Sequence, residues 1–134
     1  MENIDVNASA TPTAIRYHQK SRILEVEFGE QTFELGAEYL RVYSPSAEVR
    51  GHGPGQEVLQ VGKEDVSITA IEPVGHYAVK LLFSDGHDSG LYTFEELYRL
   101  GAERERLWQD YLARLERAGH KRKPQLNVVS VQSS

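Results

Sequence analysis

The hydrophobic pattern of this chain changes its period once, near Tyr92. Before that residue, short apolar runs alternate in steps of two, which is typical of half-buried strands. After it, large apolar residues recur every three or four positions, as on one face of an amphipathic helix. These are Leu97, Leu100, Leu107, Trp108, Tyr111, Leu112 and Leu115. Strands followed by helix predict the α+β class: a sheet-rich body of short, mainly antiparallel strands and a C-terminal amphipathic helical segment.

Several segments before this change have the character of strands. They are 23–28, 32–35, 58–61, 66–71 and 77–83. The last is the most apolar run and predicts a central strand, and Pro73 is expected to end the strand before it. Residues 38–43 fit a strand or a short helical turn, and their pattern leaves both open. The stretch 44–56 is rich in proline and glycine, so it predicts the longest internal loop.

Capping and glycine signals predict the bounds of the helical segment. Thr93 with Glu96 three positions later forms a capping box, so the helix should begin near Phe94. Gly101 should split or kink it, because glycine costs about 1 kcal/mol relative to alanine inside a helix. Gly119 supplies the residue that closes its last turn.

The length and the composition predict one domain. The chain has 134 residues, enough for a core without disulfides. We expect a flexible arm over 1–12, the domain over 13–119 and a flexible basic and polar tail over 120–134. Cysteine is absent, which excludes thiolate zinc sites, cysteine-ligated iron-sulfur clusters and cysteine nucleophiles. The same absence fits a reducing compartment, so a cytoplasmic location is expected.

The charge of the chain bears on its partners. Fifteen Lys and Arg residues against twenty Asp and Glu give a net charge of -5, which repels phosphate backbones. Nucleic acid is therefore not an expected partner. No stretch approaches the roughly 18 apolar residues of a membrane span, and the first 13 residues do not resemble a signal peptide, so no membrane partner is expected either.

The sequence offers no convincing catalytic set. It has no Gly-x-Ser-x-Gly nucleophile motif. The glycine-rich stretch 51–55 lacks the Gly-Lys-Ser/Thr ending of a phosphate-binding loop. We therefore expect no catalytic residue, and a protein that is not an enzyme.

Histidines are the candidates for a metal site. His52, His76 and His87 fall in predicted loops, and Asp85 and Asp88 flank the last of them. Two histidines and one carboxylate would suit non-haem iron if they converged. However, His87 and Asp88 are adjacent and point apart in an extended segment, and Asp85 precedes a glycine as tight turns require. A hydrogen-bonded surface turn is therefore favoured over a metal site.

Three segments together resemble a known family. They read LRVYSPSAEVRGH over 40–52, IEPVGHYAV over 71–79 and FSDGHDSGLY over 83–92. Over about residues 13–118 the chain resembles the small bacterial proteins named for the N-terminal domain of gamma-butyrobetaine hydroxylase. In the hydroxylases this domain precedes a separate domain that carries the iron and the chemistry. The resemblance therefore implies an accessory module without the dioxygenase domain.

The resemblance also bears on metals. In those hydroxylases the domain holds a structural zinc through a Cys-Pro-Cys-x-x-Cys run and a later histidine. The cysteine positions correspond to Ser44, Ser46 and Val49 here, and the histidine to His87. Three of the four ligands are lost, so the chain is expected to fold without zinc. Similar domains are attached to P-loop ATPases with iron-sulfur clusters, which implies a role beside iron metabolism and leaves iron as the alternative cofactor.

Two functional hypotheses follow. The first is a non-catalytic binding module that docks on a protein partner through a polar face of Arg50, His52, Asp85 and His87. The second is a metal- or small-ligand-binding protein, in which the 44–52 loop and the 85–88 turn close on one polar pocket. The second requires those two segments to be adjacent in space.

Overall fold

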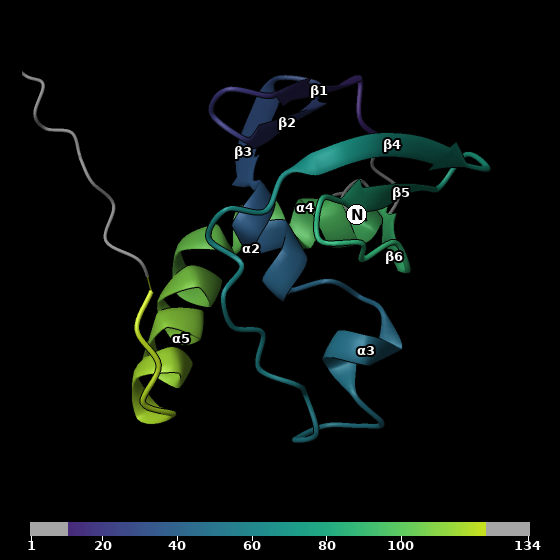
Figure 1. Cartoon of the computed structure of the whole chain (residues 1–134). Coiled ribbons are helices and arrows are strands. Elements are labelled where there is room, and N and C mark those ends of the chain that lie inside the picture. The colour runs from purple at the N-terminus through teal and green to yellow at the C-terminus, as the bar shows by residue number, and fades with distance from the viewer. Residues whose placement is uncertain (1–10, 123–134) are drawn as a thin grey trace, which may run out of the picture.

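The computed structural model describes residues 11–122 and contains two antiparallel sheets (Figure 1). The first sheet has the order β1 (Ala14–His18), β2 (Ile23–Phe28) and β3 (Gln31–Gly36). The second has the order β4 (Ile68–Val74), β5 (Ala78–Phe83) and β6 (Gly90–Thr93). The helices are α2 (Ala37–Val42), α3 (Ala47–Arg50), α4 (Phe94–Ala102) and α5 (Arg104–Arg117). This confirms the predicted α+β class.

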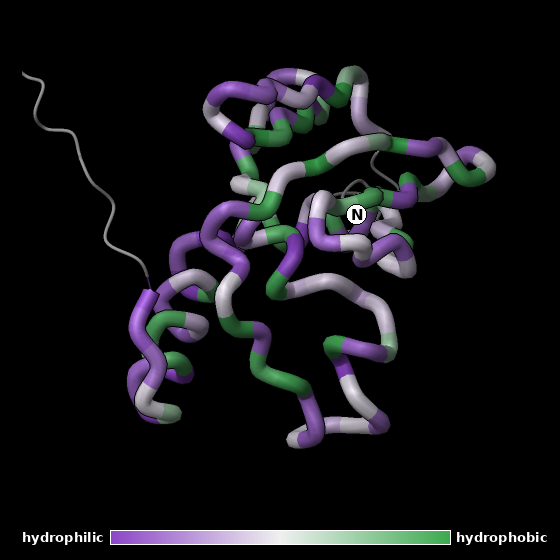
Figure 2. The backbone as a smooth tube through the Cα atoms, in the orientation of Figure 1, coloured by the Kyte–Doolittle hydropathy of each residue, from purple (hydrophilic) through white to green (hydrophobic). Residues whose placement is uncertain are grey.

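Alternating side chains place the first sheet on the core. Leu24 and Val26 are fully buried on β2, and their partners across the ladder to β3 are Leu35 and Phe33. The second sheet buries more of its central strand, since Ala78, Val79, Leu81 and Phe83 are all buried on β5. Along α5 hydrophobic and hydrophilic positions alternate (Figure 2), as its predicted stripe requires. Both sheets thus share one apolar core with α2, α4 and the start of α5.

The predicted helix start is confirmed. Thr93 Oγ1 accepts a hydrogen bond from the Glu96 N–H at 3.0 Å, and α4 begins at Phe94. The helical segment is split as expected, with the break at Glu103, two residues after Gly101. Gly119 follows the end of α5 with a φ of +80°, a conformation that suits glycine. Among residues 11–122, no helix has the length and apolarity that crossing a membrane requires.

Gly101 has a packing role beyond the helix break. A Cβ atom at this position would lie 2.3 Å from the Phe33 ring, so only glycine lets α4 approach β3 this closely. Gly101→Ala should therefore lower the free energy of unfolding by about 1 to 3 kcal/mol, although alanine favours helix. Urea denaturation of the variant measures this. A more stable variant would show that Phe33 moves aside at little cost.

The structure differs from the sequence prediction in several elements. Segment 38–43 is helical (α2), and the predicted loop 44–56 contains the short helix α3. Pro73 does not end its strand, because β4 is an edge strand and needs no N–H there. Segment 58–61 is not a strand, and β1 and β6 were not expected as strands.

The contacts of Gln60 explain why segment 58–61 does not pair with a sheet. The Gln60 side chain accepts a hydrogen bond from Arg41, and the Gln60 carbonyl accepts one from the Tyr111 hydroxyl. Polar contacts with helices therefore replace a strand ladder. Residues 1–10 and 123–134, which include most of the predicted arm and tail, lie outside the described residues.

Candidate functional site

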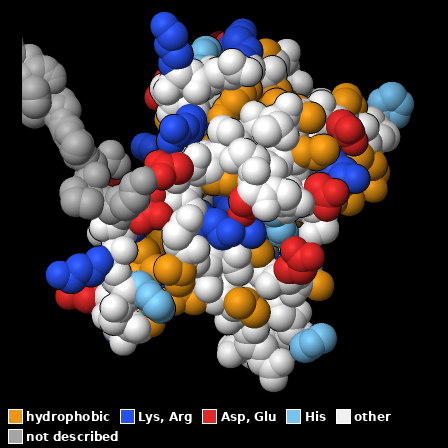
Figure 3. Space-filling view, viewed as in Figure 1, with side chains coloured by type: hydrophobic (Ala, Val, Ile, Leu, Met, Phe, Trp, Pro, Cys, Tyr) orange, Lys and Arg blue, Asp and Glu red, His pale blue; other side chains and the backbone are white. Residues whose placement is uncertain are grey.

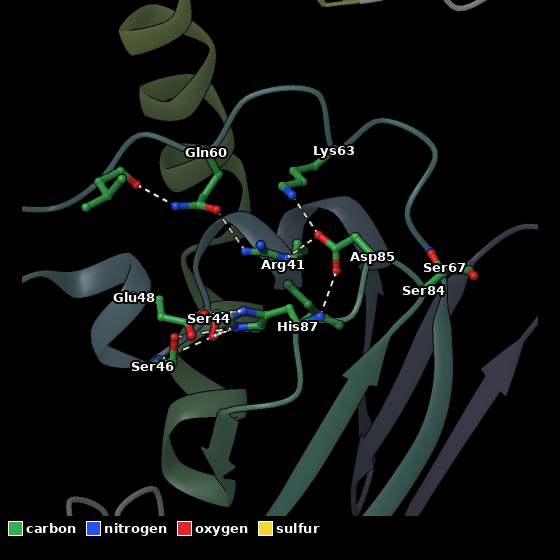
Figure 4. A network of polar contacts seen from close by, with 12 residues as sticks. Arg41, Ser44, Ser46, Glu48, Gln60, Lys63, Ser67, Ser84, Asp85 and His87 are labelled. Atoms are coloured by element: carbon green, nitrogen blue, oxygen red, sulfur yellow. Dashed lines mark hydrogen bonds and ion pairs between the residues drawn. The ribbon is translucent and has the colours of Figure 1, made fainter.

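Ser44, Ser46 and His87 meet where the segment after α2 crosses the turn between β5 and β6 (Figure 4). His87 Nε2 lies 2.9 Å from Ser44 Oγ and 3.4 Å from Ser46 Oγ. Ser44 is fully buried, and 2% of the His87 side chain is exposed. Two segments separated by some 40 residues in sequence are thus joined by buried hydrogen bonds, since Ser44 and His87 are 43 positions apart.

The other ring nitrogen of His87 faces Glu48. Its Nδ1 lies 3.0 Å from Glu48 Oε1, and a carboxylate can only accept there. Nδ1 therefore carries the proton, and Nε2 accepts from the Ser44 hydroxyl. Burial, followed by the charge of Arg41, lowers the pKa of His87 against the opposing effects of Glu48 and Asp85. The ring is consequently neutral near pH 7.

The lowered pKa of His87 predicts a pH effect on stability. The unfolded chain binds the proton near pH 6.5, whereas the folded chain binds it only at lower pH. The contribution is therefore complete above about pH 6.5 and is lost as the pH falls towards the folded-state pKa. Thermal melts between pH 8 and 5 should show a smaller loss for His87→Asn than for the wild type, and equal losses would contradict this.

The order Ser44, His87, Glu48 matches the order of a nucleophile, base and acid in hydrolases. The environment does not match, because the Ser44 hydroxyl has no exposed surface. The Ser46 N–H also donates to Ser44 Oγ at 3.2 Å, instead of pointing to where an oxyanion would form. A substrate carbonyl could not reach this serine without opening the fold. We interpret the three residues as a clamp between two segments.

Asp85 anchors the next part of the same network. Its carboxylate lies 2.9 Å from Arg41 Nε and 2.7 Å from Lys63 Nζ, and it also accepts from the His87 N–H at 3.1 Å. Burial raises the pKa of Asp85, but the hydrogen bonds from Lys63, His87 and Arg41 together outweigh it and hold the pKa at about 2. In Figure 3, basic and acidic side chains meet near the centre of the view.

Arg50 and His52 lie elsewhere, on the wall of a cleft of about 560 Å³. The cleft separates the segment 49–58 from α2, α4 and α5. Its charged and titratable side chains are Arg50, Arg99, Arg114, His52 and Glu57. Its apolar and aromatic side chains are Val42, Val49, Pro54, Val58, Leu107 and Tyr43. The cleft thus combines arginines from both of its sides with an apolar surface.

The shape of the cleft depends on one glycine. Gly51 has a φ of +75°, and a Cβ atom there would lie 2.0 Å from the Gln56 carbonyl oxygen. The loop after α3 can therefore fold back on itself only with glycine at this position. The Val58 N–H then donates to the Val49 carbonyl at 2.8 Å, which fixes the outer wall.

The four residues predicted to form one polar face are thus divided between two places. Arg50 and His52 line the cleft, whereas Asp85 and His87 belong to the network around Arg41. Ser44 connects the two places, since it lies behind the cleft surface and bonds His87. The 44–52 loop and the 85–88 turn are adjacent, as the second hypothesis requires.

Sequence reasoning missed Arg99 and Arg114. Both lie on the predicted helical segment, where arginines are common on exposed faces, so nothing local marks them. Only the arrangement of α4 and α5 opposite the 49–58 segment brings them to the cleft.

One known protein family matches this chain. The family described as gamma-butyrobetaine hydroxylase-like, N-terminal, matches residues 15–98, which is more than half of the chain. The chain belongs to this family. A comparison with curated proteins gave no match.

Solved structures support the membership of this gamma-butyrobetaine hydroxylase-like domain. One NMR solution structure of a protein is 50% identical, covers 92% of this chain and 98% of its own, and has a TM-score of 0.76. A second NMR structure is 49% identical, with 90% and 91% covered and a TM-score of 0.75. A crystal structure of a protein with unknown function, of the DUF971 family from Acidithiobacillus ferrooxidans, is 44% identical, with 69% and 94% covered and a TM-score of 0.58.

The donors at the position where the resemblance implies a zinc do not suit that metal. Ser44 and Ser46 present hydroxyls, Val49 presents no donor, and the His87 Nε2 lone pair is engaged by Ser44. Structural zinc requires four thiolate, imidazole or carboxylate ligands. Within residues 11–122, no three His, Cys, Asp or Glu residues are grouped to hold a metal ion. The chain thus resembles those hydroxylases in the positions of these residues, but the side chains at these positions are not a set of zinc ligands.

Proposed function

We propose that this chain is a non-catalytic binding module that holds a protein partner in the cleft between the 49–58 segment and the helices. The observation that carries the proposal is the clustering of Arg50, Arg99 and Arg114 on one cleft of a chain whose net charge is -5. The lining residues include three arginines and one glutamate, so the cleft is locally more basic than the chain as a whole and would direct an acidic partner to one place. The module is expected to act in the cytoplasm.

The apolar side of the cleft supports a protein as the partner. Val58 has 51% of its surface exposed at the edge of the cleft, and Leu107 lies on the opposite wall. Interfaces bind through such apolar and arginine-bearing pockets surrounded by polar residues. Apolar side chains are visible over α5 and over the segment after α3 (Figure 3).

The alternative, a metal or small-ligand site between Ser44 and His87, has one observation in its favour. The two segments do come together there. Their donors already bond one another, however, and the Ser44 hydroxyl is buried, so a ligand would have to displace existing hydrogen bonds. The link to iron metabolism rests on the resemblance alone.

Affinity capture with a matched pair of variants tests the proposal. Arg50 is 53% exposed in the cleft, and Arg16 is 48% exposed on β1. Arg50→Glu and Arg16→Glu change the charge equally at two different faces. We expect a protein captured by the wild type and by Arg16→Glu to be lost with Arg50→Glu. Equal capture by both folded variants would show that the cleft is not the binding surface.

A further inference from the structure

The hydrogen bonds that the cleft arginines already make indicate which chemical group they bind. Arg50 Nη2 and Arg99 Nη2 both donate to Glu96 Oε2, at 3.1 and 2.8 Å. A carboxylate of the chain itself therefore already lies between two of the three guanidinium groups. The flat guanidinium matches a carboxylate in shape, and five N–H donors leave Arg50 with unused ones.

Arg114 has longer contacts than Arg50 and Arg99, since its Nη2 donates to the Tyr43 hydroxyl at 3.5 Å. Within the part of the chain that the structure describes, its Nε is the one buried side-chain nitrogen or oxygen without a hydrogen bond. Asp110 Oδ2 lies 3.5 Å away as an ion pair but does not form the hydrogen bond. The guanidinium lies 5.7 Å from the centre of the Tyr43 ring. The buried Nε is out of reach from the cleft, but 27% of the Arg114 side chain is exposed, and its long contacts leave the guanidinium able to donate to a carboxylate in the cleft.

The surroundings favour a singly charged acceptor that has an apolar neighbour. Glu57 lines the same cleft, and the chain as a whole is negative, so a doubly charged phosphate is repelled more than a carboxylate. Val58 is exposed at the cleft, and its backbone is tied to Val49. The volume of about 560 Å³ is far more than one small anion fills.

We propose that the cleft binds a peptide segment of the partner in which an Asp or Glu side chain lies beside an aliphatic or aromatic one. The carboxylate accepts from Arg114, and the apolar side chain covers Val58. This rests on the proposed function and adds the chemistry of the bound segment.

Titration of the isotope-labelled chain with short blocked peptides tests the proposal by NMR. The first peptide is Ser-Gly-Glu-Leu-Gly-Ser, the second replaces Glu by Gln, and the third replaces Leu by Ser. Inorganic phosphate is the fourth probe. We expect the first peptide to shift the amide signals of Gly51 and Val58. The second should bind about tenfold more weakly or worse, because a hydrogen bond between charged groups is lost. The third should also bind more weakly.

Two variants assign the effect to its residue. Arg114→Gln should bring the Glu and Gln peptides to similar affinity, whereas Arg16→Gln, on the first sheet, should leave their difference unchanged. Equal binding of the Glu and Gln peptides to the wild type, no binding at millimolar concentration, shifts confined to other faces, or phosphate binding more tightly than the first peptide would each overturn the proposal. If Arg50→Glu still loses the captured partner in any of these cases, the binding module stands and only its bound segment is wrong.

Discussion

Asp85→Asn should lower the free energy of unfolding by about 2 kcal/mol. The variant removes the charge that faces Arg41, whose side chain is 8% exposed, and leaves that guanidinium with the neutral Gln60. Removing one partner of a buried ion pair costs about 3 to 5 kcal/mol. Since 24% of the Asp85 side chain is exposed, solvent screening reduces the effect to the lower figure. Urea denaturation at pH 7 measures it.

The pH dependence identifies the cause of this loss. The pKa of Asp85 is lowered from 3.8 to about 2, so its contribution is complete above about pH 4 and is lost as the pH falls towards 2. The difference between wild type and Asp85→Asn should shrink over that range. Asp88→Asn makes the same charge change on the same turn at an exposed residue, and its effect should stay within about 0.5 kcal/mol. A loss for Asp88→Asn equal to that for Asp85→Asn would assign the effect to overall charge.

The parts of the fold that the sequence predicted correctly depend on local signals. Strand β2 alternates buried and half-buried residues, and α4 begins with a capping box that needs only Thr93 and Glu96. The wrong assignment at 58–61 has a different origin. Val58 and Val61 have strand propensity, but Gln60 between them is engaged by Arg41 and Tyr111, which lie far away in sequence.

The candidate site could likewise be predicted from the sequence only in part. The family resemblance was sufficient to relate Ser44 and Ser46 to His87, and the structure places all three in contact. The arginine cleft was beyond that reasoning, because Arg50, Arg99 and Arg114 come from three helices whose packing decides whether they face one cleft. Long-range packing, not residue type, makes these arginines a site.

Cysteines introduced into the clamp should make this chain bind zinc. Ser44 Oγ and Ser46 Oγ already lie beside His87 Nε2, at 2.9 and 3.4 Å. Val49 follows Ser46 by one helical turn, and its N–H donates to the Ser46 carbonyl at 3.1 Å. Replacing the three with cysteine (S44C, S46C, V49C) supplies three thiolates and one imidazole, a common structural zinc set. The triple variant should bind one zinc per chain, tighter than micromolar, and melt at higher temperature with zinc than without it.

Two matched proteins separate this gain from adventitious binding. The triple variant with His87→Ala keeps the thiolates but loses the imidazole, so it should bind zinc more weakly. The native chain, purified without added metal, should contain no stoichiometric zinc, because its hydroxyls are poor ligands. Zinc bound tightly by the native chain would overturn the interpretation of the clamp as a hydrogen-bonded replacement for a metal. Failure of the triple variant to bind zinc would show that residue 49 is not placed to supply a ligand beside residues 44, 46 and 87.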